Sequence, residues 1–270
     1  MIVTVVTPTL NGVGYLRQCI ESVKRNHGQG YEVDHVIVDG GSTDGTVELA
    51  QSYGLRIRQG RDDGIFDAIN KGSFDSKGDL LGFLGADDVM LDGALQAVTE
   101  ARRKRGRRWI VGGIRWIDEK GLSLGELAAP PAWMTTRMHV CLGWNPIMHM
   151  STYIARDFFE ELGGFDKRFR DSGDYDLFAR ALARSPYERL PQPLTCFRRT
   201  GENNSAIHFA RTRAENRSVR EAFGPRSETE RAFWRFVLRA WMNGRNPRWM
   251  MAKFTGAAQH RLGLQEKAYF

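Results

Sequence analysis

The chain has 270 residues and a net charge of +7, with 41% hydrophobic and 26% charged residues, as in an ordinary soluble globular protein with room for one large α/β domain. It has no run of roughly 18 apolar residues that would span a membrane, and residues 1–6 resemble a first strand rather than a secretory signal. The three scattered cysteines predict reduced thiols in a cytosolic protein and have no zinc-binding spacing.

The first 90 residues alternate between short apolar runs and stretches with helical spacing. The apolar runs predict strands at 3–6, 33–38, 55–58 and 80–84. The helical spacing predicts helices at 15–26, 46–53 and 67–76. Because strand–helix alternation implies right-handed crossovers, we expect an α/β fold with a mostly parallel central sheet flanked by helices.

Polar residues follow the first, second and fourth of these strands. Residues 7–9, Thr-Pro-Thr, begin a turn-rich loop after the first strand, and Asp39 follows the second. Asp87 and Asp88 follow the fourth. Ligands of open α/β sheets bind outside the carboxyl ends of the strands. The pattern therefore predicts one site, suited to a nucleotide, at a shared edge of the sheet.

The adjacent acids Asp87 and Asp88 suit a hard divalent cation, Mg²⁺ or Mn²⁺, which often bridges a protein carboxylate to a substrate phosphate. The alternative is an Asp-rich turn or a helix cap. Asp39 suits either a hydrogen bond to a base or ribose, or an Asx-turn. Neither glycine-rich phosphate motif, G-x-G-x-x-G or G-x-x-x-x-G-K-[ST], follows the first strand. We therefore expect a metal to neutralise the phosphates.

Six blocks of sequence carry a resemblance to a known family. They are residues 6–11, 36–46, 63–72, 82–88, 163–166 and 173–180. In this order they resemble the inverting family 2 glycosyltransferases, which implies the GT-A (Rossmann-like) fold over roughly the first 200 residues. The block Asp-Gly-Ile-Phe-Asp-Ala-Ile-Asn-Lys-Gly at 63–72 resembles the subgroup that builds bacterial surface polysaccharides.

The resemblance implies a role for each matching residue. The residues implied to bind the nucleotide are Thr7, Pro8, Thr9, Asn11, Asp39, Arg61, Asp63 and Asp87. Among them Asp39 would contact the base, usually uracil, and Asp87 would approach the ribose. Asp88 would ligate the metal, Mn²⁺ or Mg²⁺, that bridges the diphosphate.

The chain departs from the family pattern at one important position. Many members have Ala-Arg-Asn where this chain has Ala-Ile-Asn at 68–70, so the arginine that faces the diphosphate is missing. Arg61, Lys71 or a distant basic residue is expected to replace it. Ala86, at the first position of the ribose and metal motif, is a common variation.

The second half of the chain begins with a basic block at 102–108 and a predicted strand at 109–117. Residues 122–138 contain two adjacent prolines and are expected to form either a long loop over the site or a disordered excursion. A short helix is expected at 157–162. Between them lies His149, where similar sequences have Pro-x-x-His near the acceptor. His149 would bind the acceptor, orient a base or simply pack among methionines.

Another acid group, Asp-Ser-Gly-Asp-Tyr-Asp, begins a predicted helix. By motif position Asp174 matches the family's catalytic base, which takes the proton of the acceptor hydroxyl, although Gly173 stands where Glu is common. Acids at a helix N-terminus are also stabilised by the macrodipole without any chemistry. Asp176 is expected to be structural or to contact the acceptor. His208, farther on, would complete a metal site or be an ordinary loop residue.

Residues 211–270 are predicted to form a basic, amphipathic, helical C-terminal extension. Arginines beside tryptophan and phenylalanine suit an interfacial helix on an anionic membrane surface. Core packing against residues 1–210 or a homodimer contact would explain the apolar residues equally well. Within the first 210 residues, we expect a nucleotide-binding half at about 1–92 and an acceptor-binding half at about 93–210.

Together these features predict a metal-dependent inverting glycosyltransferase that moves a sugar from a nucleotide-sugar, by resemblance a UDP-sugar, to a hydroxyl of a glycan or lipid-linked acceptor. The resemblance implies cell-surface polysaccharide synthesis in the cytoplasm or on the inner face of the membrane. The alternatives are a nucleotide-sugar-forming nucleotidyltransferase, whose glycine-rich loop is missing here, and a basic nucleic-acid-binding protein. The acid groups would repel a phosphate backbone, so no nucleic-acid partner is expected.

Overall fold

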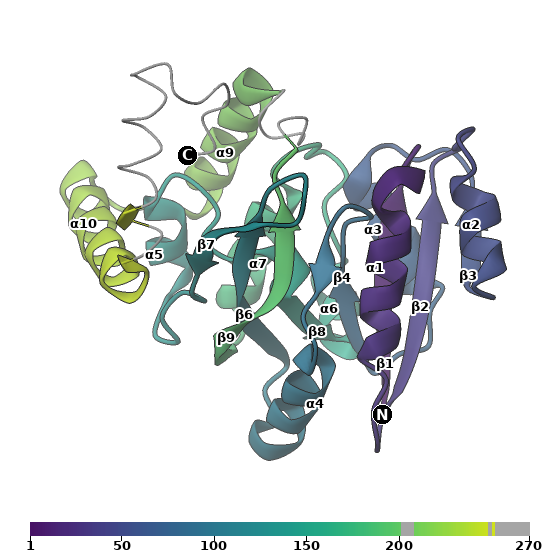
Figure 1. The fold of residues 1–270 in the computed structure, drawn as a ribbon. Coiled ribbons are helices and arrows are strands. Elements are labelled where there is room, and N and C mark those ends of the chain that lie inside the picture. Colours follow the sequence, from purple (N-terminus) through teal and green to yellow (C-terminus); the bar gives the residue numbers. More distant parts are fainter. Residues whose placement is uncertain (201–207, 248–249, 252–270) are drawn as a thin grey trace.

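The computed structural model describes residues 1–200, 208–247 and 250–251. Its strands are β1 (Ile2–Thr9), β2 (Glu32–Asp39), β3 (Arg56–Gln59), β4 (Leu80–Phe83), β5 (Val89–Met90), β6 (Trp109–Ile117), β7 (Ser123–Leu127), β8 (Thr152–Ala155) and β9 (Glu188–Arg198). They form one mixed sheet in the order β3-β2-β1-β4-β8-β6-β9-β5, with β7 paired to β6 outside this path (Figure 1).

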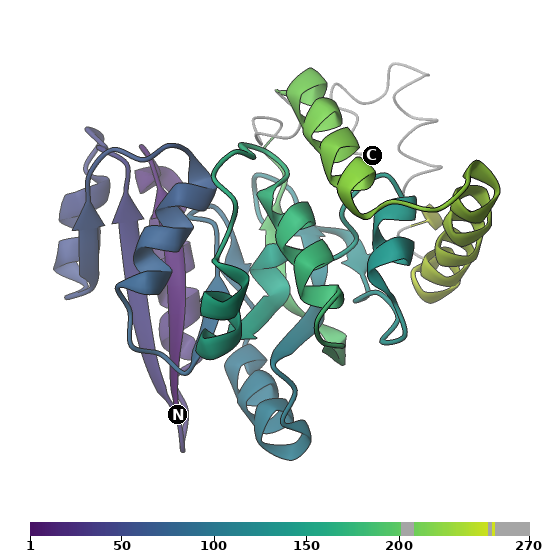
Figure 2. The same cartoon turned by 180° about the vertical axis from the view of Figure 1, so that it is seen from behind.

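Helices cover both faces of this sheet. They are α1 (Val13–Arg25), α2 (Thr46–Ser52), α3 (Ile65–Phe74), α4 (Ala94–Arg105), α5 (Thr136–Cys141), α6 (Arg156–Leu162), α7 (Gly173–Leu182), α9 (Phe209–Phe223) and α10 (Glu228–Arg245), with a 3-10 turn η1 (His149–Ser151). Helix α1 lies in front of the sheet in Figure 1, whereas α3, α6 and α7 cover the face seen in Figure 2. The predicted α/β fold class is confirmed.

The first half of the sheet is parallel, as predicted, because β1 pairs in parallel with β2 and β4, and β2 with β3. The prediction that β1 ends at Val6 is wrong, since the strand continues to Thr9. Beyond Val6 the strand pairs only with β2. On the β4 side, Pro8 therefore has no strand partner. Proline lacks an N–H to donate, so a sheet tolerates it at such an unpaired position. The carboxyl ends of β1, β2 and β4 meet at one edge.

The second half of the sheet contains antiparallel pairs. β8 lies between β4 and β6 and is antiparallel to both, β5 is antiparallel to β9, and β6 is parallel to β9. The residues of β8 are all buried. A fully buried strand lacks the alternation of apolar and polar residues by which a half-buried strand is recognised in a sequence.

The prediction of a long loop or disordered excursion at 122–138 is wrong. After a turn in which Asp118 Oδ1 accepts from the backbone N–H of Leu122 (2.8 Å), β7 pairs antiparallel with β6. Helix α5 then begins where Thr135 Oγ1 accepts from the N–H of Met138. The two prolines separate these elements. The strand sequence Ser-Leu-Gly-Glu-Leu has little intrinsic β-propensity, so its pairing depends on β6.

Helices α9 and α10 pack on the rest of the protein at the end remote from β3 (Figure 1). Val219 of α9 lies in a buried cluster with Tyr175 and Ala179 of α7. Leu238 and Met242 of α10 lie in another, with residues of β6, β7 and α5. Core packing therefore explains these apolar residues. The predicted basic stretch after residue 247 lies, except for residues 250 and 251, outside the described residues.

The cysteines and the helix lengths bear on two expectations from the sequence. The three cysteines are buried free thiols, as predicted, and burial raises the pKa of Cys141 to about 11, which makes a thiolate unfavourable. Within the described ranges, none of the helices combines the length and apolar character that crossing a bilayer requires.

Candidate active site

The loops after β1 and β2 are tied together at the sheet edge. Asn11 donates its backbone N–H to Ser42 Oγ (2.8 Å), and its side-chain oxygen accepts from the N–H of Thr43 (3.0 Å). Asn11 has a positive φ of 51°, a conformation that asparagine tolerates better than most residues. Asp44 Oδ2 accepts from the N–H of Val13 (3.1 Å). These bonds fix the predicted nucleotide residues on neighbouring strands relative to each other.

Asp39, at the end of β2, is 1% exposed. Its Oδ2 accepts from the backbone N–H groups of Gly41 and Ser42, both at 3.0 Å, and its Oδ1 accepts from the Ser42 hydroxyl. This is the Asx-turn that the sequence analysis weighed. The turn holds the carboxylate at the edge of the sheet, and base contact remains a prediction.

The three β1 residues predicted to line the nucleotide pocket differ in their surroundings. Thr7 is fully buried, and its hydroxyl lies 2.9 Å from His35 Nε2 on β2, so its side chain packs in the core. Pro8 is partly exposed. Thr9 Oγ1 is buried without a hydrogen-bond partner in the described structure. A Cβ on Gly12 would lie only 2.5 Å from that oxygen, so the glycine permits this close approach.

Asp87 and Asp88 turn their carboxylates toward one point. Asp87 Oδ1 and Asp88 Oδ2 each lie 2.9 Å from where a Cβ on Gly85 would be. Burial raises the pKa of Asp87, although Arg198 and His149 partly oppose the rise. Burial and the neighbouring charge of Asp87 raise the pKa of Asp88 well above its usual value. Two converging acids, the buried Asp88 and the half-buried Asp87, therefore lack a full countercharge.

This donor set fits a divalent cation. Carboxylate oxygens are the ligands that Mg²⁺ and Mn²⁺ prefer, and a bound cation would offset the repulsion between Asp87 and Asp88. In the part of the chain that the structure describes, no group of three His, Cys, Asp or Glu side chains is arranged to hold a metal. His208 is exposed at the start of α9.

Arg198, at the end of β9, is a site residue that the sequence analysis missed. It is 1% exposed. Its backbone N–H donates to Asp88 Oδ1 (3.0 Å), and its guanidinium donates to the carbonyl oxygens of Asp87 (2.8 Å) and Asp118 (3.1 Å) and to Gln18 Oε1 (2.7 Å). The available signal was weak, because Arg198 is followed directly by a second arginine and only the last part of its strand is mostly buried.

The loop with Arg61 and Asp63 is held by the start of α3. Lys71 Nζ lies 2.7 Å from Asp67 Oδ2 and 2.9 Å from Asp62 Oδ1, and it donates to the carbonyl oxygen of Arg61 (2.8 Å). Asp63 donates its N–H to Asp67 Oδ2 (3.1 Å). Three oxygens thus engage the Lys71 ammonium, whereas the Arg61 and Asp63 residues are exposed.

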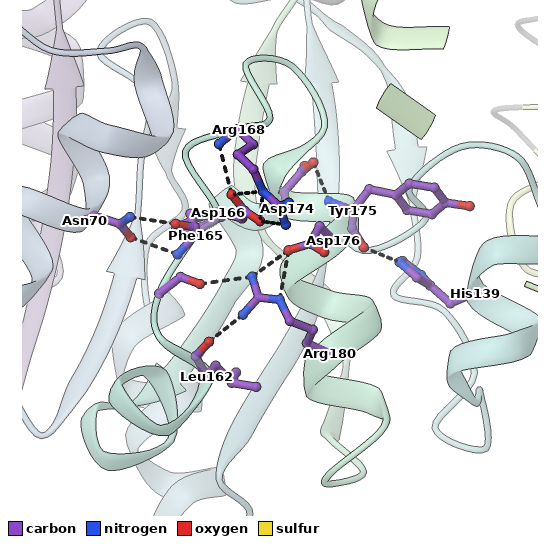
Figure 3. A network of polar contacts seen from close by, with 11 residues as sticks. Asn70, His139, Leu162, Phe165, Asp166, Arg168, Asp174, Tyr175, Asp176 and Arg180 are labelled. Carbon is purple, nitrogen blue, oxygen red and sulfur yellow. Dashed lines mark hydrogen bonds and ion pairs between the residues drawn. The ribbon is translucent and has the colours of Figure 1, made fainter. Parts of the chain in front are cut away.

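Asp174 lies in the first turn of α7, beside His149 of η1. His149 Nδ1 is 3.3 Å from Asp174 Oδ2, and the two side chains are 17% and 18% exposed. Asp174 Oδ1 accepts from the N–H of Tyr175 (2.7 Å) (Figure 3). The structure therefore brings together two residues that were predicted separately. The charge of His149 also lowers the pKa of Asp87, after the larger effects of burial, a backbone hydrogen bond and Arg198, so His149 lies near both acid groups.

Asp176 is engaged differently, on the buried side of α7. Its Oδ2 accepts from Arg180 Nε (2.8 Å) and Nη2 (2.6 Å), and Arg180 also donates to the carbonyl oxygens of Leu162 and Gly164 (Figure 3). Asp176 is 7% exposed. This contact gives Asp176 the structural role that the sequence analysis weighed against acceptor binding.

A cavity of about 820 Å³ lies between α3 and residues 162–168. Its five basic residues are each in ion pairs, and they are Arg58, Lys71, Lys167, Arg168 and Arg180. Asp87 and Asp88 are not among the described residues that line it. We therefore place the predicted nucleotide site at the sheet edge and not in this cavity.

Two solved structures share this fold. TarS 1-349 of S. aureus in complex with UDP-GlcNAc aligns with a TM-score of 0.60 and 15% identity, over 93% of this chain and 79% of that chain. The mannosyltransferase PcManGT from Pyrobaculum calidifontis, in complex with GDP-Man and Mn²⁺, aligns with a TM-score of 0.59 and 17% identity, over 95% and 75%. At such identities the likeness shows the fold alone, which is GT-A.

Sequence relatives are more informative about the family. An uncharacterized glycosyltransferase of Rickettsia felis is 29% identical over 197 residues, 68% of this chain and 32% of that protein. A PGL/p-HBAD biosynthesis glycosyltransferase of Mycobacterium bovis is 26% identical over 202 residues, 67% of this chain and 69% of that protein. The chain thus spans about a third of the first relative's length. Residues 4–163 match the family model described as Glycosyl transferase family 2. Since this match covers more than half of the chain, the chain belongs to that family.

Proposed function

We propose that this glycosyltransferase is metal-dependent and inverting, and that it transfers a sugar from a UDP-sugar to an acceptor hydroxyl. The observation that supports the proposal is the presence of two acid groups near His149, one at the end of β4 and one at the start of α7. Asp87 and Asp88 converge over Gly85, and Asp174 is held by His149, which also influences Asp87. One acid group suits a cation at the leaving diphosphate, and the other suits a base at the acceptor.

In this proposal Asp88 would ligate the divalent cation, Mn²⁺ or Mg²⁺, and Asp87 beside it would approach the ribose. The cation, when bound, stabilises the negative charge on the departing diphosphate. The mannosyltransferase neighbour was solved with GDP-Man and Mn²⁺, which supports metal use. Arg198 donates hydrogen bonds to the Asp87 carbonyl and the Asp88 carboxylate. These bonds fix the two acids, so they would bind the donor without rearranging.

Asp174 takes the proton of the acceptor hydroxyl as that oxygen forms its bond to the anomeric carbon. The bond from that carbon to the diphosphate breaks in the same displacement, and the electron pair leaves with the nucleotide. A single carboxylate suffices for a single displacement, which inverts the anomeric carbon. The hydrogen bond between His149 Nδ1 and Asp174 orients the base, or it places His149 against the acceptor.

The remaining predicted residues would bind the nucleotide. Asn11 and Asp39 lie at the tied loops after β1 and β2, where a base and ribose would sit, and TarS was solved with UDP and with UDP-GlcNAc. Lys71 is engaged by Asp67 and Asp62. Exposed Arg61, beside Asp63, is therefore the better replacement for the missing family arginine.

We further propose that the acceptor is a glycan or lipid-linked molecule of cell-surface polysaccharide synthesis, and that the enzyme works in the cytoplasm or at the inner face of the membrane. The Mycobacterium bovis relative is named for PGL/p-HBAD biosynthesis, and residues 63–72 resemble the surface-polysaccharide subgroup; both support this proposal. Helix α10 offers exposed arginine and phenylalanine side chains for an anionic lipid surface.

A thermal-shift panel tests the donor site. Nucleoside diphosphates and nucleotide-sugars are added with Mn²⁺, Mg²⁺ or EDTA to the wild type and to Asp88→Ala. A ligand at 100 times its Kd raises the free energy of unfolding by about 2.7 kcal/mol. We expect UDP compounds to raise the melting temperature only with metal, and Asp88→Ala to abolish this rise.

Asp92→Ala is the matched control, because the Asp92 side chain is 73% exposed and pairs only with Arg25 among its recorded ion pairs. It should keep the full metal-dependent shift. The proposal would be contradicted if no nucleotide stabilised the wild type with either metal, or if EDTA left the shift unchanged.

A further inference from the structure

The segment immediately before α7 is held by a residue of α9. The Glu215 carboxylate accepts from the backbone N–H groups of Arg170, Asp171 and Ser172, each at 2.9 Å. Arg170 binds one carboxylate oxygen and the other two N–H groups share the second. Three consecutive backbone donors thus converge on one side chain that lies 43 to 45 positions farther along the chain.

A second contact from α9 secures the same segment. The Asp171 side chain is 1% exposed. Arg211 donates to its two oxygens through Nε (2.7 Å) and Nη2 (2.8 Å), and Thr212 Oγ1 adds a third contact (3.2 Å). Because the arginine and the carboxylate are joined by two hydrogen bonds, the relative orientation of the two groups is fixed as well as the distance between them. Charged groups from one helix therefore hold residues 170–172 through both backbone and side chain.

This segment determines where Asp174 lies. The first N–H groups of a helix have no partner within the helix, and Ser172, the residue before α7, makes no side-chain cap. Glu215 accepts from the residues that lead into this helix start. On the other side, a Cβ on Gly173 would lie 2.6 Å from the Phe66 ring. The start of α7 is therefore confined between α9 and α3. Because Asp174 directly follows Gly173, its position depends on these contacts.

We propose that Glu215 and Arg211 are positioning residues for Asp174, so that α9 is part of the catalytic unit and not an appendage to it. The inference rests on the proposed role of Asp174 as base. Misplacing a reacting group by about 1 Å can cost on the order of 100-fold in rate. Most of the proposed donor residues lie at the carboxyl ends of β1, β2 and β4, and neither Glu215 nor Arg211 bonds to any of them in the described structure. Loss of the contact should therefore lower kcat and leave donor binding unchanged.

The test compares Glu215→Gln with Glu221→Gln, an exposed residue on the same helix. Glutamine keeps a single acceptor oxygen, so it cannot satisfy the N–H groups on both sides of the carboxylate. We expect kcat in Glu215→Gln to fall roughly 10- to 100-fold with the KM for the nucleotide-sugar unchanged. Hydrogen exchange should show lost protection at the amides of 170–172, while Glu221→Gln behaves as the wild type.

A second variant distinguishes loss of positioning from a general folding defect in Glu215→Gln. Arg211→Lys keeps the charge but loses the two-point geometry, and it should show the same selective fall in kcat, to a smaller extent. The proposal is overturned if amide protection at 170–172 survives Glu215→Gln, or if protection is lost and kcat stays at the wild-type value. Failure of the proposed function would appear separately, as a wild type that transfers sugar from no nucleotide-sugar while the 170–172 amides remain protected.

Discussion

At the scale of single residues, the acids of α7 are distinguished by their partners. Asp176 meets Arg180 through two hydrogen bonds and is 7% exposed, so its charge is neutralised inside the fold. Asp174 meets only the imidazole of His149 at 3.3 Å among its recorded side-chain contacts. Arg180 occupies Asp176 inside the fold, although burial still raises the pKa of that acid above its usual value. Asp174 has no arginine partner among its described contacts. Geometry thus favours Asp174 as the base.

We predict that Asp174→Asn lowers kcat by about 100-fold or more, in line with typical general-base contributions. Asparagine keeps the size of the side chain but cannot take the proton. Donor affinity, measured by calorimetry with UDP and metal, should not change. Asp176→Asn is the informative contrast, because breaking a buried ion pair costs about 3 kcal/mol or more of stability and should lower the melting temperature first. Near wild-type turnover in Asp174→Asn would contradict the role of the base.

At the scale of elements, local pattern predicted some strands well and others not at all. Trp109–Ile117 has the predicted bounds, because a long apolar run leaves few alternatives. Ser123–Leu127 was missed, since its pairing comes from β6 and not from its own residues. The strand Thr152–Ala155 was not predicted either, because all four residues are buried and its place between β4 and β6 depends on the tertiary fold.

Helix α10 carries its own prediction. Leu238 and Met242 are buried, whereas Phe236 on another face is 72% exposed. Burial, and then the nearby charge of Arg235, lowers the pKa of Arg239, which indicates two like charges close together. Each basic residue near an anionic membrane contributes about 1 kcal/mol. We expect binding to anionic vesicles at low salt, weakened roughly 30-fold or more by the double variant Arg235→Glu/Arg239→Glu, because two attractive charges are lost and two repelled ones are added.

The matched control reverses two exposed arginines of α9, Arg213→Glu/Arg217→Glu, which changes the net charge equally. Vesicle co-sedimentation at several salt concentrations measures the binding, because screening weakens it as the Debye length falls below about 10 Å. Equal losses in the two double variants would indicate attraction by net charge and not by α10. Absence of binding by the wild type would remove the membrane proposal.

At the scale of the whole molecule, the site depends on contacts between distant parts of the chain. The Asn70 side chain of α3 makes two hydrogen bonds with the backbone of Phe165, which lies 95 positions farther along the chain. It donates to the carbonyl oxygen and accepts from the N–H, each at 2.8 Å. Arg198 reaches Asp88 across 110 positions. Motif order predicted most of the acids in the site, but the residues that hold them are far away in sequence. A single sequence contains no measure of such distances, which explains why Arg198 and Glu215 were missed.

The final prediction concerns a chain that ends at residue 210, where the sequence analysis placed the end of the catalytic domain. This truncation removes Val219, Leu238 and Met242 from buried clusters. Burying each such side chain contributes about 1.5 to 3 kcal/mol, so their loss costs about 5 to 9 kcal/mol, comparable to the 5 to 15 kcal/mol of a typical domain. The cut also removes Asn246, whose Oδ1 accepts from the N–H of Ala128 (2.6 Å).

We therefore expect residues 1–210 alone to melt far below the full chain or to aggregate, and to lose UDP binding together with the folded state. A chain ending at residue 251 keeps every contact named above and is the control. Differential scanning calorimetry compares the three lengths. If residues 1–210 melted cooperatively at the temperature of the full chain, α9 and α10 would be an independent extension. The Glu215 contact would then be dispensable for the fold, and only the kinetic test of Asp174 positioning could still establish a role for it.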